Sequence, residues 1–395
     1  MRIPIKISAT MTGECEWNDG FENRVVRVPE AARIKYSLPV GSFLHLRDKH
    51  GQLFPLQVVP AFKEDTQKDA AAGYVTERVF NYLVIVQDFK QEVERVANIT
   101  LGCDPEAFLM DAKTGHIVSA TRFFRRMGDV GHDGMLLEFR PMPSIRAEVV
   151  TDNLWQLIQK ARRELNTRGE GNRIIMVASS GLQGLTAGFH LHYGLPYALL
   201  GRRPPVRHLA NLMVTLFDYY IGVPAVIPEG EVDHHRRTVA YVDYGKPGGY
   251  RLDNRTFEFR LPGGSLLRHP VLTAGLMSLG AVVVEDFVSR VREATDNFTG
   301  ITDIRSLTDI RALYPNLPQP MDIHSLIVSV NLQPARERMS AIVNDIRKMV
   351  GYKERANAIE AFFSCIEKGT KFSSNIEENW GGYYHAEQQG QMGFL

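Results

Sequence analysis

The sequence predicts an α+β fold in which helices cover one face of an antiparallel sheet. Short apolar or alternating runs, typical of strands, dominate the first ninety or so residues. From residue 98 onward, strand-like motifs alternate with longer stretches of helical periodicity. Because the strands come first and the helices are interposed later, a sheet with helices packed on one side is the expected architecture.

Composition limits the classes of protein that need to be considered. The chain has 395 residues, with 44% hydrophobic and 23% charged, which argues for a folded protein with a sizeable core. The formal net charge of +1 offers no overall field for nucleic acid or a membrane surface, so an anionic substrate needs a local cluster of cations. Cys15, Cys103 and Cys365 are too few and too far apart for a disulfide framework. With no signal peptide and no run of ~18 apolar residues, we expect a cytoplasmic protein without a membrane span.

Residues 1–97 are predicted to form a small β-rich domain, for which a scaffold or partner-docking role is the simplest interpretation. The polar stretch Lys63 to Asp69 is expected to be an exposed loop. The strand-like runs are Val25–Val28, Phe43–Leu46, Leu53–Val59 and Tyr82–Val86.

Residues 98–395 are predicted to form the main domain. Apolar residues recur at helical spacing over Ala147–Leu165, Val206–Tyr220 and Pro270–Val291. Two or three further helices are expected between Ile323 and Glu367. The Gly-, Gln- and Tyr-rich stretch from Asn379 is expected to be irregular.

The first of four chemically informative segments is Gly102–Leu109. Asp104 and Glu106 are two residues apart, so on a strand both carboxylates point to one face, roughly 7 Å apart. They repel each other unless a cation lies between them. Pro105, which lacks a backbone donor, suggests an edge or the start of a strand. Taken alone, a solvated acid pair is the more economical interpretation.

The second segment is Gly134–Pro141. Glu138 and Arg140 share one face of the expected strand, while Leu137 and Phe139 share the other, which looks like a core face. A surface ion pair, worth only ~0–1 kcal/mol, explains this pattern equally well.

The third segment, Gly188–Gly194, projects His190 and His192 from the same face. A neutral imidazole is a common metal ligand, although a single pair of packed, hydrogen-bonded histidines is an equally good explanation.

The fourth segment, Arg255–Gly264, repeats the Glu–Arg pattern with Glu258 and Arg260. The glycine- and proline-rich loop Tyr244–Tyr250 precedes it and could let the backbone approach a phosphate, although a plain hairpin loop is about as good an interpretation. Burying this many charges without a ligand would be costly. Divalent cations and a polyphosphate would satisfy both signs, because carboxylates hold metals and arginines neutralise phosphate oxygens.

Together, the four motifs resemble the glutamine synthetase and glutamate–cysteine ligase superfamily. More narrowly, GCDPEAFL, GMLLEFRPMPS, GFHLHYGLP and RTFEFRLPGG resemble the carboxylate–amine ligase-like (amidoligase) proteins encoded by some tailed phages. The resemblance covers roughly residues 98–290. It implies a glutamine synthetase-like catalytic domain with a curved antiparallel sheet, preceded by the small β-rich domain.

The resemblance also implies a role for each matched residue, with Arg260, Glu258 and Glu138 acting in catalysis. His192 would lie near the nucleotide phosphates, and Arg260 would contact the substrate carboxylate or the transferring phosphoryl group. Asp104 stands where the family often has glutamate, so its shorter side chain could bind metal directly or through water. The implied metal ligands are Asp104, Glu106, Glu138, His190 and Glu258. Looser matches to nucleotide-phosphate arginines are Arg237, Arg251 and Arg255.

We therefore expect an ATP-dependent ligase that joins a small-molecule or peptide carboxylate to an amine through an acyl phosphate. A mostly oxygen ligand set favours Mg²⁺, and one histidine is compatible with Mn²⁺. Asp133 and Asp243 are candidates for the base that deprotonates the amine. The expected location is the cytoplasm, or the host cytoplasm for a phage-encoded protein, with an oligomer compatible with the sequence.

Three other functions stay open. A guanidino-kinase-like phosphotransferase would stop at a stable phosphorylated product. A metallohydrolase could use the histidines and acids but would have little use for the arginines near Glu258. A non-catalytic structural or interaction protein could retain the fold.

Overall fold

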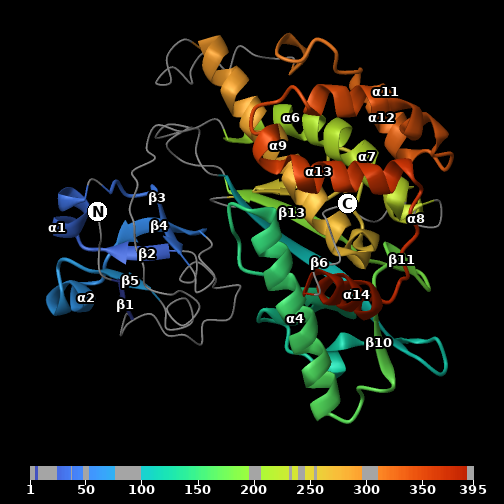
Figure 1. Cartoon of the computed structure of the whole chain (residues 1–395), viewed down its shortest axis with the longest axis horizontal. Helices are drawn as coiled ribbons and strands as arrows, with labels where there is room; N and C mark the ends of the chain where they lie inside the picture. The colour runs from blue at the N-terminus through green and yellow to red at the C-terminus, as the bar shows by residue number, and fades with distance from the viewer. Residues whose placement is uncertain are drawn as a thin grey trace.

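The computed structural model describes residues 5–7, 25–36, 38–47, 53–75, 99–194, 206–230, 234–238, 245–252, 256–295 and 310–388. It combines a large antiparallel sheet, packed helices and a smaller sheet near the N-terminus (Figure 1). The predicted α+β class is therefore confirmed.

The N-terminal part contains a five-stranded sheet in the order β1-β5-β2-β4-β3. The predicted runs in the described residues are confirmed as β2, β3 and β4, whereas Tyr82–Val86 lies outside the described residues. The boundary at residue 97 stays a prediction. The elements are β1 (Ile5–Ile7), β2 (Val25–Val28), α1 (Glu30–Lys35), β3 (Phe43–Arg47), β4 (Leu53–Pro60), α2 (Lys63–Lys68) and β5 (Gly73–Val75).

Helix α2 replaces the exposed loop predicted for Lys63 to Asp69, so that prediction was wrong. Glu64 and Asp65 lie in its first turn and Lys68 in its last, which complements the helix dipole. Asp65 is buried, so the polar composition hid one residue that turns inward.

The main sheet is antiparallel and runs in the order β14-β15-β13-β6-β9-β8, with β7 and β10 also pairing with β6. A separate hairpin joins β11 (Gly181–Leu182) to β12 (Leu185–Thr186). The strands of the main sheet are β6 (Thr100–Asp111), β7 (Ile117–Val118), β8 (Val130–Asp133), β9 (Leu136–Phe139), β10 (Ile174–Val177), β13 (Phe189–Gly194), β14 (Tyr250–Leu252) and β15 (Thr256–Phe259).

The three predicted amphipathic helices are confirmed as α4 (Ala147–Thr167), α6 (Val206–Phe217) and α9 (Pro270–Thr295). A π-helical turn, η4 (Asp218–Gly222), joins α6 to α7 (Val223–Glu229). The remaining helices are η3 (Ala120–Arg122), α8 (His234–Thr238), η6 (Gly264–Arg268), η7 (Ile310–Ala312), α11 (Pro320–Val328), α12 (Gln333–Ile346), α13 (Tyr352–Glu367) and α14 (Ile376–Gln388).

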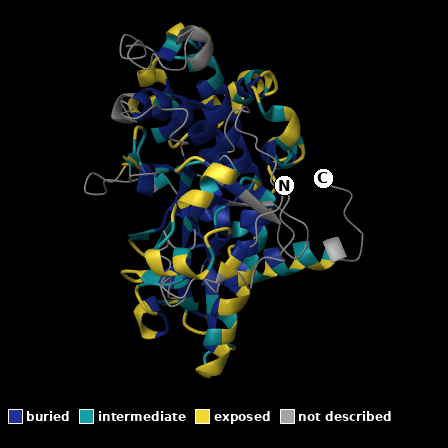
Figure 2. Cartoon of the chain, turned by 90° about the vertical axis from the view of Figure 1, so that its left-hand side faces the viewer, coloured by how far each residue is buried: buried dark blue, intermediate teal, exposed yellow. Residues whose placement is uncertain are grey.

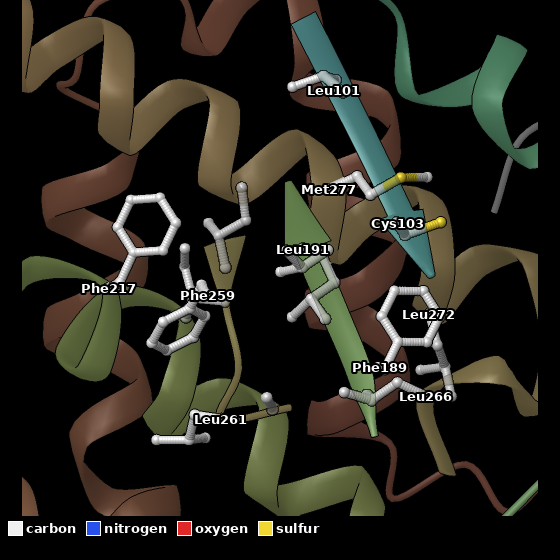
Figure 3. Packing of buried hydrophobic residues seen from close by; sticks show 14 of the residues in the cluster. Leu101, Cys103, Phe189, Leu191, Phe217, Phe259, Leu261, Leu266, Leu272 and Met277 are labelled. Atoms are coloured by element: carbon white, nitrogen blue, oxygen red, sulfur yellow. The ribbon is translucent and has the colours of Figure 1, made fainter. Parts of the chain in front are cut away.

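The apolar face of the main sheet packs against these helices. Leu101 and Cys103 of β6 lie beside Phe189 and Leu191 of β13, and Met277 of α9 reaches the same cluster (Figure 3). The alternation of a strand turns these residues to one face and leaves the polar residues between them on the other. Buried residues accordingly concentrate in the body of the helices and the sheet, while exposed residues lie at the periphery, on outward helix faces as well as on turns and loops (Figure 2).

Two helical stretches, Leu209–Glu229 and Pro270–Val291, are long and apolar enough to cross a membrane by composition. In each, 89% of the most apolar window is buried inside the protein. Their apolar character is thus accounted for by the core against which they pack.

Residues 379–388 form most of α14, so the irregular structure predicted for them was wrong, and residues 389–395 of the same prediction lie outside the described residues. Trp380 is fully buried, and its indole N–H donates to the Leu267 carbonyl at 2.8 Å. Trp155 of α4 stacks on Tyr384. Aromatic burial anchors a helix whose glycines and glutamines favour disorder.

Candidate active site

Acids and imidazoles from all four motifs line up across the main sheet, on the face opposite the helices. In the strand register each lies opposite another, as His190 does with Asp104. Opposite residues on neighbouring strands point to the same face, so the sheet gathers them. These six side chains are called the polar row: Asp104, Glu106, Glu138, His190, His192 and Glu258.

The centre of the polar row is a compact cluster around Asp104. Its Oδ1 lies 3.1 Å from His192 Nε2 and 3.4 Å from His190 Nδ1. His190 Nδ1 also lies 3.6 Å from Glu258 Oε1. One ligand atom each from Asp104, His192 and Glu258 lies within 4.8 Å of the others, a grouping that suits a metal ion.

The donor set fits a divalent cation. Within the described part of the chain, Asp104 Oδ1 and Glu258 Oε1 are buried and lack a hydrogen bond of good geometry, although charged nitrogens lie nearby. Glu106 and Glu138 face each other in register, where like charges destabilise the sheet. A cation would relieve both conditions.

Burial and charge act together on these carboxyl groups. Burial alone would raise the pKa of Asp104, but the charges of His192 and His190 lower it below its usual range. Burial raises the pKa of Glu106. Burial, followed by the charge of Asp104, raises the pKa of Glu138 to about 8. Neighbouring acids of the row therefore disfavour one another's ionised form, and a positive charge between them would favour it.

Glycine at position 188 lets Glu106 and His190 approach each other. The Gly188 N–H donates to Glu106 Oε2 at 2.6 Å. A Cβ added at Gly188 would lie 2.4 Å from His190 Nε2 and 3.0 Å from Arg236. The glycine of the GFHLHYG motif is thus a packing requirement of the site.

Arginines stand at both ends of the polar row. At the β15 end, Arg260 Nε lies 3.1 Å from Glu258 Oε1, and Arg251 Nε on β14 lies 2.5 Å from Glu258 Oε2. At the β9 end, Arg140 contacts Glu138 and donates to the Gly128 carbonyl at 2.9 Å. The predicted Glu–Arg pairs are therefore ion pairs that face the row.

Arg237 is bonded to Glu229 and not to the polar row, and its predicted role stays a prediction. Its guanidinium pairs with Glu229 at 2.9 Å and donates to the Ile327 carbonyl, and both charged side chains are fully buried. Its neighbour Arg236, which sequence reasoning missed, donates to the Arg260 carbonyl at 3.1 Å and lowers the pKa of Glu106 against the larger effect of burial. The only sequence signal was the Arg–Arg pair itself.

Of three other residues with predicted roles in the site, the structure describes one. Asp133 is exposed at the end of β8, opposite Leu136. Arg255 and Asp243 lie outside the described residues, so their predicted roles stay predictions.

Asp218 is a second residue that sequence reasoning missed. It lies on the π turn, is 7% exposed, and accepts the Gly248 N–H at 2.7 Å. Burial raises its pKa to about 8. Gly248 belongs to the glycine-rich loop, which is also bonded to the backbone of Arg260. An acid in the middle of the apolar run of 209–228 was the signal that could have found it.

A sequence model of the family described as phage phiEco32-like COOH.NH2 ligase-type 2 matches residues 101–298, the stretch that carries the polar row. No curated protein matches the chain in sequence.

Solved structures resemble the chain only weakly. A bifunctional glutathione synthetase from Pasteurella multocida is 12% identical with a TM-score of 0.33, over 67% of this chain and 52% of that one, so this chain spans about half its length. The complex of the prokaryotic ubiquitin-like protein Pup with its ligase PafA shows 10% sequence identity and a TM-score of 0.37. The match covers 75% of this chain and 70% of that one. Apo GmaS shows 12% sequence identity and a TM-score of 0.37, over 88% of this chain and 98% of that one. TM-scores of this size say nothing about substrate or reaction.

Proposed function

Because the chain belongs to the phage phiEco32-like COOH.NH2 ligase-type 2 family, we propose that it is an ATP-dependent carboxylate–amine ligase. ATP phosphorylates a carboxylate, an amine attacks the acyl phosphate, and an amide and phosphate are released. The observation that carries the proposal is the polar row, in which four carboxylates and two imidazoles share one sheet face and guanidinium groups contact the acids at both ends.

The polar row would hold divalent cations. Asp104, His192 and Glu258 offer the grouped ligand atoms, His190 lies against two of them, and Glu106 and Glu138 complete the predicted set. When bound, Mg²⁺ or Mn²⁺ would neutralise the phosphates of ATP and the charge that develops on the transferring phosphoryl group.

The arginines on β14 and at the end of β15 would orient the phosphates. Glu258 contacts both Arg251 and Arg260 and so fixes their guanidinium groups beside the row. Preorganised donors of this kind stabilise developing charge without reorganising during the reaction. Arg260 is the residue we assign to the transferring phosphoryl group.

The glycine-rich loop would line the nucleotide at the same end. Gly245 and Gly248 have φ of +83° and +76°, which side chains rarely adopt, so the loop can turn its backbone tightly beside Arg260. The carboxylate, the amine and a cytoplasmic location belong to the proposal, and Asp133 stays the described candidate for the base.

Hydroxylamine trapping tests the proposed reaction without knowledge of the natural amine. The purified protein with ATP, Mg²⁺, hydroxylamine and a panel of carboxylic acids should form a hydroxamate, with one ADP and one phosphate released for each. A stable phosphorylated acid or guanidine without phosphate release would instead indicate a phosphotransferase.

Glu258→Gln should abolish hydroxamate formation while the circular dichroism spectrum stays unchanged. Glu164→Gln is the matched control, because Glu164 lies on α4 in a partly exposed ion pair with Arg168. Equal turnover by the Glu258 variant and the control would show that the polar row is not the active site.

A further inference from the structure

Arg236 on α8 is a fully buried cation that the proposed chemistry does not use. Three arginines of the described residues are buried, and two of them, Arg140 and Arg237, contact carboxylates. The guanidinium of Arg236 donates to two successive backbone carbonyls, from Nη1 to Leu261 and from Nη2 to Arg260 at 3.1 Å. Burying a guanidinium is costly, and here its hydrogen bonds hold the backbone just beyond the end of β15.

Helix α8 is held against α11 on either side of Arg236. His234 Nε2 contacts the Val328 carbonyl at 2.6 Å, and Arg237 Nε donates to the Ile327 carbonyl at 2.9 Å. These two contacts fix the main chain of Arg236 from outside the polar row. The side chain of Arg236 then reaches from this support to the end of β15.

The guanidinium of Arg236 lies on the polar face of the sheet. Gly188 precedes His190 by two residues, so a side chain there would point to the face that carries the polar row. A Cβ added at Gly188 would lie against His190 Nε2 and 3.0 Å from Arg236 Nη2, so both groups border the same point. The charge of Arg236 also lowers the pKa of Glu106, against the larger effect of burial. Arg236 therefore lies beside two members of the polar row.

The same guanidinium lies against the glycine-rich loop. A Cβ added at Gly245 would lie 2.7 Å from Arg236 Nη1 and 2.8 Å from its Cζ. The Gly245 N–H and Arg236 Nη2 both donate to the Arg260 carbonyl, each at 3.1 Å, and the Arg260 N–H donates to the Gly249 carbonyl. The loop, Arg260 and Arg236 thus share one hydrogen-bond network.

We propose that Arg236 is a positioning residue that sets Arg260 and the glycine-rich loop for the phosphates of the nucleotide. Glu258 contacts the side chain of Arg260, and Arg236 binds its backbone, so both the place and the direction of that guanidinium are fixed. Donors fixed in advance stabilise developing charge without reorganising. Because Arg236 is fully buried, it acts through these neighbours and not by touching the phosphates. The inference rests on the proposed function, since it takes the β15 end of the row as the nucleotide end.

Binding of AMPPNP, the β,γ-imido analogue of ATP, tests this role by isothermal titration calorimetry in the presence of Mg²⁺. Arg236→Lys keeps the charge but lacks the planar fork that reaches both carbonyls, so the affinity should fall roughly tenfold. Arg162→Lys is the matched control and should bind like the wild type. Arg162 also donates to two backbone carbonyls, those of Gly171 and Ile174, but it lies on α4.

A double-mutant cycle separates positioning from a merely structural role. Arg260→Lys alone should weaken AMPPNP binding. Adding Arg236→Lys to it should cost only about threefold or less, because the side chain through which Arg236 acts has already been lost. An equal loss in both backgrounds would show that Arg236 does not act through Arg260, and wild-type affinity in Arg236→Lys would also overturn the inference.

The contact can also be tested from the side of the loop, which keeps the inference testable if Arg236→Lys does not fold. Gly245→Ala places a methyl group against the guanidinium, whereas Gly248→Ala carries similar backbone strain into open space, with φ of +76° against +83°. AMPPNP binding should therefore fall more in the Gly245 variant. Equal losses in the two variants would count against Arg236 and overturn the inference.

Turnover separates this inference from the proposed function. Hydroxamate formation by the wild type, together with AMPPNP binding that does not depend on Arg236, would overturn the inference and leave the ligase proposal standing. Arg236-dependent AMPPNP binding without any hydroxamate would support the positioning role and sink the ligase proposal instead. A wild-type protein that binds no AMPPNP would overturn both.

Discussion

Two groups of buried charge in this protein are built differently. Glu229 and Arg237 form a pair with one charge of each sign, and the Gly263 N–H and the Ile327 carbonyl add a further hydrogen bond to each partner. The polar row gathers four carboxylates and two imidazoles on one sheet face, with arginines in contact with the acids at its two ends. A balanced pair is complete in itself, whereas an excess of one sign needs a ligand of the other.

Breaking the balanced pair should have the largest effect, and that effect should be on stability. Arg237→Met leaves the Glu229 charge buried without its partner, which should cost about 3–5 kcal/mol in the free energy of unfolding. Urea denaturation measures it. Arg163→Met, at an exposed position, should stay within about 0.5 kcal/mol of the wild type, and equal losses in both variants would contradict the comparison.

Neutralising an acid of the polar row should affect activity and spare stability. Glu258→Gln should lower turnover by roughly a hundredfold or more, because a proposed metal ligand is lost. The metal-free variant should unfold at the same urea concentration as the wild type or a higher one, since one of several repelling charges is gone. A large loss of stability in this variant would mean that Glu258 is a structural residue like Glu229.

Stability of the metal-free protein should fall as pH rises from about 5 to 8. The pKa of Glu138 in the folded protein is about 8, above its ordinary value near 4.5, so the folded state holds a proton in this range that the unfolded state has lost. Asp218 acts with the same sign, whereas the lowered pKa of Asp104 acts only at more acidic pH. We expect a loss of several kcal/mol, measured by urea denaturation with EDTA.

Mg²⁺ should reverse this loss, so its stabilising effect should be larger at pH 8 than at pH 6. Glu138→Gln should flatten the pH dependence without removing it, because Asp218 remains. A slope in this variant equal to that of the wild type would show that Glu138 does not carry the titration.

Removing the hydrogen bond between Asp218 and the glycine-rich loop should have the smallest effect. Asp218→Leu leaves the Gly248 N–H without its acceptor and should raise KM for ATP about fivefold, with little change in kcat. Asp218→Asn keeps an acceptor and should restore most of the affinity. Equal KM values in the two variants would mean that the hydrogen bond does not position the loop.

The sequence predicted the family and the α+β class, and both predictions are confirmed. The family was predicted from the resemblance of the four motifs to known ligases. Strand alternation separately predicted, from a spacing of two residues, which polar side chains share a face. The roles assigned to individual site residues stay predictions, although the structure brings Asp104, His190 and Glu258 together.

Contacts between residues far apart in the sequence could not be predicted from local spacing. Nothing local distinguishes Arg237, which pairs with Glu229, from Arg236, which bonds to the backbone of Arg260. Pro105 was expected at an edge or a strand start but lies inside β6. There the pairing of β6 with β9 stops at Glu106, the next residue, so the missing donor falls where the ladder ends.

Met142, which follows β9 of the main sheet, packs against the smaller N-terminal sheet. It follows Arg140 by two residues, is 6% exposed, and shares an apolar cluster with Val26, Leu56 and Val58 of the N-terminal part. Cutting away that part would expose a thioether to water and to oxidants beside the β9 end of the row. The N-terminal sheet thus covers Met142, and trimming that sheet would leave an exposed, oxidisable thioether three residues beyond β9.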